Sequence, residues 1–209
     1  MIKRKAYLLT CDENSERAIF CKNLLTKIGF DVILFKAIPH EDPVLSNKLS
    51  SLEIYRLISI GEDEWVYVFE DDINVHYEPT LEEIVKYEEI SKDKNFFYLG
   101  CCIFKELIYP ISDLKINNHK VGIANGNQRG AHAMAFSKKG ALNIYETGKL
   151  SPLKDIDVIH DIYTTFYPTY IIRQDLESYI EGHIGLFYQD RNKFKGILHT
   201  YDCNGRLQI

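Results

Sequence analysis

The sequence lacks several features that mark common classes of protein. No run approaches the roughly 18 apolar residues that span a bilayer, and the short apolar run near the N-terminus is too brief for the core of a signal peptide. The formal net charge of −5 over 209 residues argues against a general nucleic-acid binder, because phosphate binding needs a basic face. We therefore expect a cytoplasmic protein that binds no nucleic acid and has no transmembrane segment.

Paired cysteine motifs and several catalytic signatures are missing. The five cysteines are an odd number without a CxxC pair, so we expect reduced, partly buried thiols, with a zinc site or a disulfide framework as the alternative. The patterns GxGxxG, GxxxxGK(S/T) and GxSxG do not occur. Their absence weakens the case for a dinucleotide-dependent dehydrogenase, a P-loop enzyme or a serine hydrolase.

What is present indicates one soluble α/β domain. The chain is 45% apolar and 26% charged, as in ordinary globular proteins. Apolar periodicity predicts strands at 5–11, 30–38, 66–72 and 95–102, and helices at 19–28, 46–60 and 80–93. This alternation is typical of a mostly parallel central sheet flanked by helices on both faces.

The second half of the sequence is less regular. The stretch 106–130 is rich in Asn and Gly and predicts a β-ribbon or a mobile loop over a site. A strand followed by a helix that starts near Ser137 comes next, and another strand is expected within 167–175. From residue 181 onward we find no strong periodic element.

Three consecutive acids, Glu70, Asp71 and Asp72, follow the apolar strand WVYVF. Crowded carboxylates need compensation by a metal ion, by basic side chains or by water. In parallel α/β sheets, ligands bind beyond the carboxyl ends of the strands. A hard cation such as Mn²⁺ or Mg²⁺ would be bound by these carboxylate oxygens together with oxygens of a diphosphate. The structural alternative is an acidic strand-to-loop junction without a metal.

Two segments, residues 47–75 and 129–146, resemble glycosyltransferase family 25, the lipooligosaccharide and collagen galactosyltransferase-like family of the GT-A fold class. The acids match the family's Glu-Asp-Asp strand end, and the later segment matches at Gly130, Ser137, Gly140 and Ala141. Ser51 departs from the pattern, because the family usually has His there. With the opening segment 8–38 included, the resemblance covers roughly residues 5–145.

The resemblance implies inverting transfer of a sugar from a nucleotide-sugar donor, with UDP as the expected nucleotide, to a hydroxyl of a glycan or glycoconjugate acceptor. Residues 1–100 would then form the nucleotide-binding half and 101–209 the acceptor-binding half. Because the chain is short for this class, we also consider it as the N-terminal part of a larger protein.

The same resemblance assigns roles to the nucleotide and metal ligands. Asp72 is expected to bind the metal directly, and Glu70 to serve as a metal or ribose ligand, with Asp71 also in the nucleotide site. The remaining nucleotide contacts expected are Thr10, Arg17 and Ala37 around the base and ribose, and Lys48 at a phosphate. For Lys48, a solvated lysine near the start of a helix is the alternative.

Inverting transfer needs a base near the acceptor hydroxyl. Asp157, near the start of a helix, is the first candidate and Asp161 the second, although acids at this position can instead cap the helix. His183 is the candidate third metal ligand, and a surface or core histidine is the alternative. Two other functions stay open: a non-catalytic carbohydrate-binding or scaffold domain, and a Mg²⁺-dependent nucleotidyltransferase, which would need a further acid such as Asp157.

Overall fold

The computed structural model describes residues 3–103, 111–116, 118–126, 128–173, 175–176, 183–190 and 193. Parts of the predicted ribbon, at 106–110, 117 and 127, and most of the tail beyond 176 therefore lie outside the described residues. None of the described helices is both long and apolar enough to cross a membrane.

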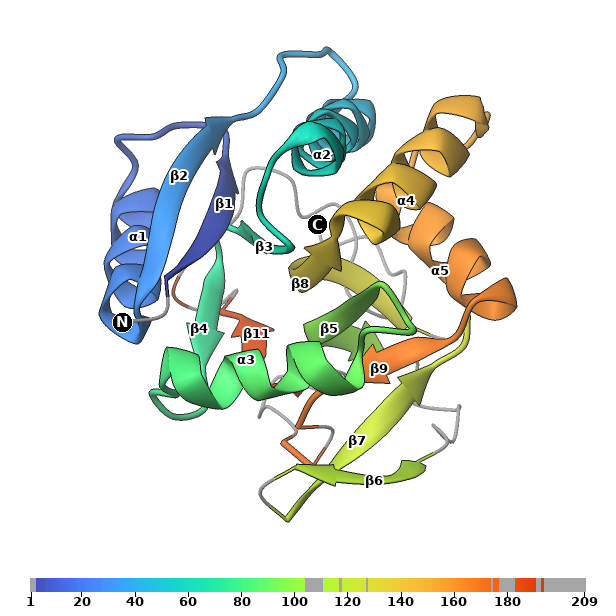
Figure 1. The fold of residues 1–209 in the computed structure, drawn as a ribbon. Coiled ribbons are helices and arrows are strands. Elements are labelled where there is room, and N and C mark those ends of the chain that lie inside the picture. Colours follow the sequence, from blue (N-terminus) through green and yellow to red (C-terminus); the bar gives the residue numbers. More distant parts are fainter. Residues whose placement is uncertain are drawn as a thin grey trace.

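Within the described residues, nine strands form one mixed sheet in the order β2-β1-β3-β8-β5-β9-β7-β6, with β10 paired to β5 (Figure 1). Its strands are β1 (Arg4–Thr10), β2 (Phe30–Lys36), β3 (Trp65–Glu70), β5 (Phe96–Ile103), β6 (Ile111–Ile116), β7 (His119–Ala124), β8 (Gln128–Ser137), β9 (Thr169–Ile171) and β10 (His183–Gly185). The strands β1, β2, β3, β5 and β9 share one direction, while β8 runs against its neighbours β3 and β5. The expected α/β architecture, a central sheet flanked by helices, is confirmed.

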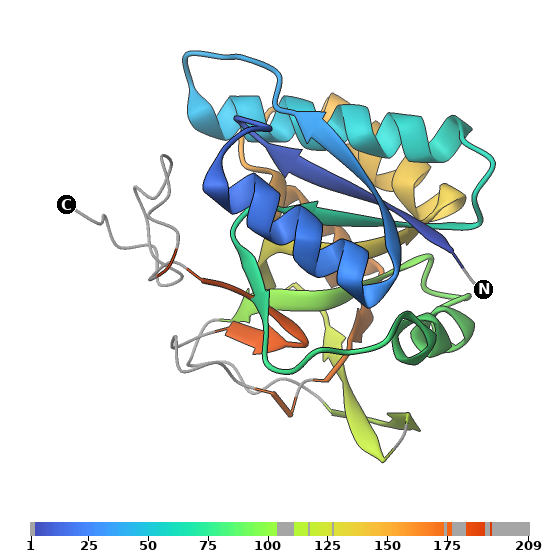
Figure 2. The same ribbon diagram turned by 90° about the vertical axis from the view of Figure 1, so that its left-hand side faces the viewer.

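Five helices in the described residues cover both faces of this sheet. They are α1 (Glu16–Ile28), α2 (Pro43–Ile60), α3 (Leu81–Ile90), α4 (Lys138–Leu150) and α5 (Ile156–Phe166). Buried residues of α1 and α3 belong to one core cluster, and buried residues of α2, α4 and α5 belong to the other. Figure 2 shows α1 and α2 on opposite sides of the strands.

The central strand β3 explains why both faces are covered. Alternate residues of a strand point to opposite faces, and Trp65, Tyr67 and Phe69 enter the cluster with α1 while Val66 and Val68 enter the cluster with α2. An uninterrupted apolar run is the pattern of a strand that is buried on both sides.

The helix ends follow from capping side chains. Ser15 and Ser137 accept hydrogen bonds from the backbone N–H groups of Ala18 and Gly140 and so start α1 and α4. The start near Ser137 is thus confirmed. In α2 the cap is Asp42 and the helix begins at Pro43, three residues before the expected start at 46, because Pro suits the first position of a helix.

For two segments in the second half of the chain, the structure confirms one prediction and contradicts the other. The ribbon expected within 106–130 is present as the antiparallel pair β6–β7, and it extends the sheet at the edge opposite β2. The expectation of no regular element in the tail is wrong, because β10 pairs with β5 and β11 (Phe187–Gln189) pairs with β4 (Ile73–Val75). Strands of three residues are too short to show a period in the sequence.

Candidate functional site

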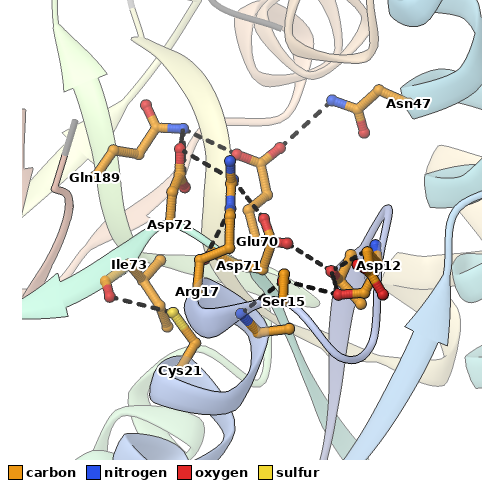
Figure 3. A network of polar contacts seen from close by, with 12 residues as sticks. Asp12, Ser15, Arg17, Cys21, Asn47, Glu70, Asp71, Asp72, Ile73 and Gln189 are labelled. Carbon is orange, nitrogen blue, oxygen red and sulfur yellow. Dashed lines mark hydrogen bonds and ion pairs between the residues drawn. The ribbon is translucent and has the colours of Figure 1, made fainter. Parts of the chain in front are cut away.

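The three acids lie where β1 and β3 end side by side, and Figure 3 shows the polar contacts around them. Asp71 accepts a hydrogen bond of 2.5 Å from Thr10 Oγ1 and forms an ion pair with Arg17 of α1. The Arg17 Nε also donates to the backbone carbonyl of Asp71 at 3.3 Å, and its guanidinium lies 3.8 Å from Asp72 Oδ2. Part of the compensating positive charge is therefore supplied by the protein itself.

Glu70 and Asp72 converge on one amide, that of Gln189 in β11. The Gln189 Nε2 donates to Glu70 Oε2 at 2.9 Å and lies 3.4 and 3.5 Å from the two Asp72 carboxylate oxygens. From the other side, Asn47 Nδ2 of α2 donates to Glu70 Oε1 at 3.4 Å. The oxygens of two carboxylates thus face a common point, with buried Asp72 only 2% exposed.

Negative charge at this point exceeds what Arg17 neutralises. Burial, together with the charges of Asp72 and Asp157, raises the pKa of Glu70 to about 8. Burial also raises the pKa of Asp71, although its contacts with Thr10 and Arg17 oppose the shift. A divalent cation would relieve this repulsion, because carboxylate oxygens are the donors that Mg²⁺ and Mn²⁺ prefer.

The donor set fits such a cation. Mg²⁺ is usually held by one or two carboxylates, and substrate phosphates and water fill its remaining positions. Glu70 and Asp72 would be those carboxylates. The Gln189 amide donates to both carboxylates. When the metal binds, this side chain would turn aside or form a hydrogen bond with a water bound to the cation.

The acids of α5 divide into a cap and two candidate bases. Asp155 caps the helix by accepting from the backbone N–H of Asp157 at 2.9 Å, so the cap of α5 is Asp155. Asp157 lies close enough to Glu70 for its charge to raise the pKa of that carboxyl. One turn further on, burial raises the pKa of Asp161 to about 6, against the opposing charge of Arg129, whose Nε lies 3.9 Å from Asp161 Oδ2.

Two predicted nucleotide contacts, Ala37 and Lys48, have different surroundings. The backbone N–H of Ala37 donates to the Thr10 carbonyl at 2.8 Å. The carboxyl end of β2 therefore lies beside the carboxyl end of β1, near the acids. Lys48 is buried, and its ammonium donates to the carbonyls of Ser151 and Leu153 at 2.9 and 2.6 Å. The interpretation of Lys48 as a solvated lysine is wrong, because it holds the connection between α4 and α5; its contact with phosphate stays a prediction.

The predicted third ligand, His183, lies among different partners from those expected. In the part of the chain that the structure describes, it groups with Cys102 and His132, and one ligand atom from each of the three lies within 4.8 Å of the others. The Oε1 of Gln189 is 3.8 Å from Cys102 Sγ, so the Gln189 side chain bridges this group and the carboxylates. A shared metal shell of His183 and Asp72 stays a prediction.

Sequence reasoning missed Asn47 and Gln189. Asn47 had a signal, because it lies one helical turn before Ser51, whose Oγ donates to Asn47 Oδ1 at 3.2 Å and so directs the amide N–H₂ toward Glu70. Gln189 had none, since only the pairing of β11 with β4 brings it to the acids.

Comparison with known proteins yields a likeness of architecture alone. No protein-family model matches the sequence, and no curated protein matches it. Among solved structures, 4-diphosphocytidyl-2C-methyl-D-erythritol synthase from Anaerococcus prevotii is 13% identical with a TM-score of 0.39, and the match covers 77% of this chain and 84% of that one. HddC from Yersinia pseudotuberculosis is 12% identical with a TM-score of 0.40, covering 79% and 88%.

An apo UDP-glucose pyrophosphorylase is 11% identical with a TM-score of 0.37, and the match covers 76% of this chain and 62% of that one. At these TM-scores the likeness is partial. The function proposed below therefore rests on the residues of the site.

Proposed function

We propose that the protein is a metal-dependent glycosyltransferase that moves a sugar from a nucleotide-sugar donor, a UDP-sugar first, to a hydroxyl of a glycan or glycoconjugate. The observation that carries this proposal is the convergence of Glu70 and Asp72 on one point at the ends of β1 and β3, beside the Thr10–Asp71–Arg17 network. In an α/β sheet, nucleotides are expected to bind beyond the carboxyl ends of the strands, where these residues lie.

The residues would divide the work as follows. Asp72 and Glu70 would hold Mn²⁺ or Mg²⁺, which when bound supplies charge stabilisation for a departing diphosphate. The ion pair with Asp71 holds Arg17 at the carboxyl ends of β1 and β3. There Thr10, Arg17 and Ala37 would surround the base and ribose. The buried acids alone would repel a diphosphate, so nucleotide binding should depend on the metal.

The base would come from α5. In an inverting transfer the acceptor oxygen attacks the anomeric carbon, the bond from that carbon to the diphosphate breaks, and a carboxylate takes the hydroxyl proton. The charge of Asp157 acts on Glu70, whereas Asp161 faces Arg129. A pKa raised to about 6 by burial suits a base that works near neutral pH, and we therefore place Asp161 ahead of Asp157 in this role.

The test is calorimetric titration of UDP and several UDP-sugars, with Mn²⁺ and with chelator, into the native protein and Asp72→Asn. We expect binding that requires Mn²⁺ and that weakens at least tenfold in Asp72→Asn. Glu82→Gln is the matched control, because Glu82 is an exposed acid in the first turn of α3. Failure of UDP and every UDP-sugar to bind would overturn the proposal, and metal-independent sugar binding would favour a scaffold domain.

A second candidate is a Mg²⁺-dependent nucleotidyltransferase, and the position of Asp157 favours it. Such an enzyme needs a further acid near the metal, and Asp157 is close enough to act on Glu70. The products separate the two functions. Release of nucleoside diphosphate from a nucleotide-sugar indicates glycosyl transfer, whereas release of pyrophosphate from a nucleoside triphosphate and a sugar phosphate indicates nucleotidyl transfer.

A further inference from the structure

A second set of potential metal ligands lies beside Gln189, on β5 and on two strands that pair with it. Cys102 of β5, His132 of β8 and His183 of β10 are all buried, and one donor atom from each lies within 4.8 Å of the others. We propose that these three side chains form a metal site for Zn²⁺, separate from the Mn²⁺ or Mg²⁺ site of Glu70 and Asp72. This site stands whether or not the protein is a glycosyltransferase.

The chemistry of the donors selects the metal. One thiolate and two imidazoles suit a borderline-soft cation such as Zn²⁺, whereas Mg²⁺ and Mn²⁺ prefer the oxygens of the neighbouring carboxylates. With Zn–S of about 2.3 Å and Zn–N of about 2.0–2.1 Å, tetrahedral geometry places sulfur and nitrogen about 3.6 Å apart. Cys102 Sγ lies 3.6 Å from His183 Nε2 and 3.8 Å from Nδ1.

The backbone is built so that these side chains can meet. His183 and Cys102 are direct partners in the β10–β5 ladder, and the β5–β8 ladder changes register on either side of Gly100. A Cβ on Gly100 would collide with the Phe187 carbonyl and lie 2.8 Å from His132 Nε2. The irregular pairing and the missing side chain together open the space that the imidazole of His132 occupies.

Gly130 leaves room on the other side of the same group. Its φ of +84° is a conformation that other residues rarely adopt. A Cβ there would lie 3.1 Å from both Cys102 Sγ and His132 Nδ1, so these two donor atoms border one shared space.

Hydrogen bonds to the two imidazoles orient His132 for metal binding but must be broken at His183. His132 Nε2 contacts the Phe187 carbonyl at 3.3 Å, and because a carbonyl can only accept, this contact keeps the proton on Nε2 and leaves the Nδ1 lone pair for a metal. His183 Nδ1 accepts from the Gln189 N–H at 3.3 Å. Zinc coordination by His183 replaces this long hydrogen bond, which lowers the affinity below that of a fully prearranged site.

Three protein ligands leave a fourth position of a tetrahedral zinc for water or for Gln189. The Gln189 Oε1 lies 3.8 Å from Cys102 Sγ, while its Nε2 donates to Glu70. Zinc would thus fix β10 and β11 against the sheet and hold the amide that contacts both carboxylates of the first site.

Cobalt is the probe for the first test, since Co²⁺ occupies zinc sites and absorbs visibly. The protein, purified with a non-chelating reductant, is titrated with Co²⁺ and then with Zn²⁺. We expect one thiolate-bound Co²⁺ per chain, seen as a thiolate-to-cobalt charge-transfer band, and loss of the band when Zn²⁺ is added. Absence of the band would overturn the site.

Variants assign the ligands. Cys102→Ser should abolish the charge-transfer band and His132→Gln should weaken Zn²⁺ binding at least tenfold. Cys101→Ser is the matched control, because Cys101 is the adjacent buried thiol in β5 but belongs to the core cluster on the other face, and its band should persist. A band that survives Cys102→Ser would contradict the assignment.

A measurement on the native chain keeps the test independent of how the variants fold. X-ray absorption at the zinc edge of the Zn²⁺-loaded protein should show one sulfur at about 2.3 Å and imidazole nitrogens at about 2.0–2.1 Å. A shell of oxygen and nitrogen without sulfur would refute the proposal, and would mean that the thiol and imidazoles form only a hydrogen-bonded cluster.

Discussion

At the scale of single residues, Arg17 supplies positive charge to two of three adjacent carboxylates. It forms an ion pair with Asp71 and lies 3.8 Å from Asp72, and its side chain is 22% exposed. Removing one partner of a mostly buried pair leaves the other charge uncompensated, which costs more than the pair contributes. Arg17 and a bound cation should therefore substitute for one another in part.

We predict that Arg17→Met lowers the free energy of unfolding by about 1–3 kcal/mol in the presence of chelator, and that Mn²⁺ recovers part of this loss. Urea unfolding followed by the fluorescence of Trp65, which is buried at the start of β3, measures both effects. Arg56→Met is the control, because its pair with Glu53 is on the surface of α2 and should contribute little. Equal losses in the two variants would contradict the prediction.

A second residue-scale effect concerns His160, whose Nε2 lies 3.1 Å from the hydroxyl of Tyr55 in the core. Burial lowers the pKa of His160 to about 3. Between the ordinary pKa of His, near 6.5, and this value, the unfolded chain binds a proton that the folded chain does not. Stability therefore falls as the pH decreases through this window.

We predict that His160→Gln, which keeps a polar group for Tyr55, reduces the loss of stability between about pH 7 and about pH 4 by roughly 1–3 kcal/mol. Urea midpoints at a series of pH values measure this slope. The matched variant His40→Gln alters an exposed histidine and controls for the loss of one imidazole. An unaltered slope in His160→Gln would show that acid unfolding is governed by other groups.

At the scale of elements, two glycines allow α4 to pack closely against its neighbours. Gly140 in the first turn of α4 packs on the backbone between α3 and β5, where a Cβ would collide with the Asn95 carbonyl. Gly148, later in the same helix, faces α2, where a Cβ would lie 2.5 Å from the end of the Leu52 side chain. A backbone carbonyl cannot move aside as a side chain can.

We predict that Gly140→Ala lowers the free energy of unfolding by more than about 2 kcal/mol, while Gly148→Ala changes it by about 1 kcal/mol or less, because the helix propensity of Ala offsets a small repacking. Denaturant unfolding of the two variants side by side makes the comparison. If both lose the same stability, helix packing rather than the Asn95 contact sets the cost.

Elements with strong periodicity could be predicted from the sequence, and short ones could not. The run Trp65–Phe69 and the cap at Ser137 carry local signals, and both elements lie where expected. β10 and β11 exist only through pairing with strands far away in the sequence, so Gln189 and the partners of His183 could not be foreseen. The acids could be placed at a strand end, but which groups surround them depends on α2, α5 and β11.

At the scale of the whole molecule, the candidate site draws residues from both halves of the chain. Thr10, Arg17 and the three acids come from the first hundred residues, and Asp157 and Gln189 come from the second. The two predicted halves are parts of one sheet. A ligand bound here should therefore stabilise the folded chain as one unit.

We predict that UDP with Mn²⁺, each at about 100 times its dissociation constant, raises the free energy of unfolding by about 2.7 kcal/mol or more, and that UDP with chelator has no effect. Thermal unfolding followed by Trp65 fluorescence and by circular dichroism should shift equally. In Asp72→Asn the stabilisation should be smaller by about 1.3 kcal/mol or more, and a full shift there would place the nucleotide elsewhere.

The insertion of β8 between β3 and β5 has a consequence for synthesis of the chain. β3 and β5 leave the ribosome first, and their common neighbour arrives only when residues 128–137 have been made. At roughly 5–20 residues per second this interval lasts on the order of several seconds. During that time the apolar strand β3 has an unpaired edge, which can pair with strands of other chains. We therefore expect the nascent chain to depend on chaperones more than the folded protein would suggest.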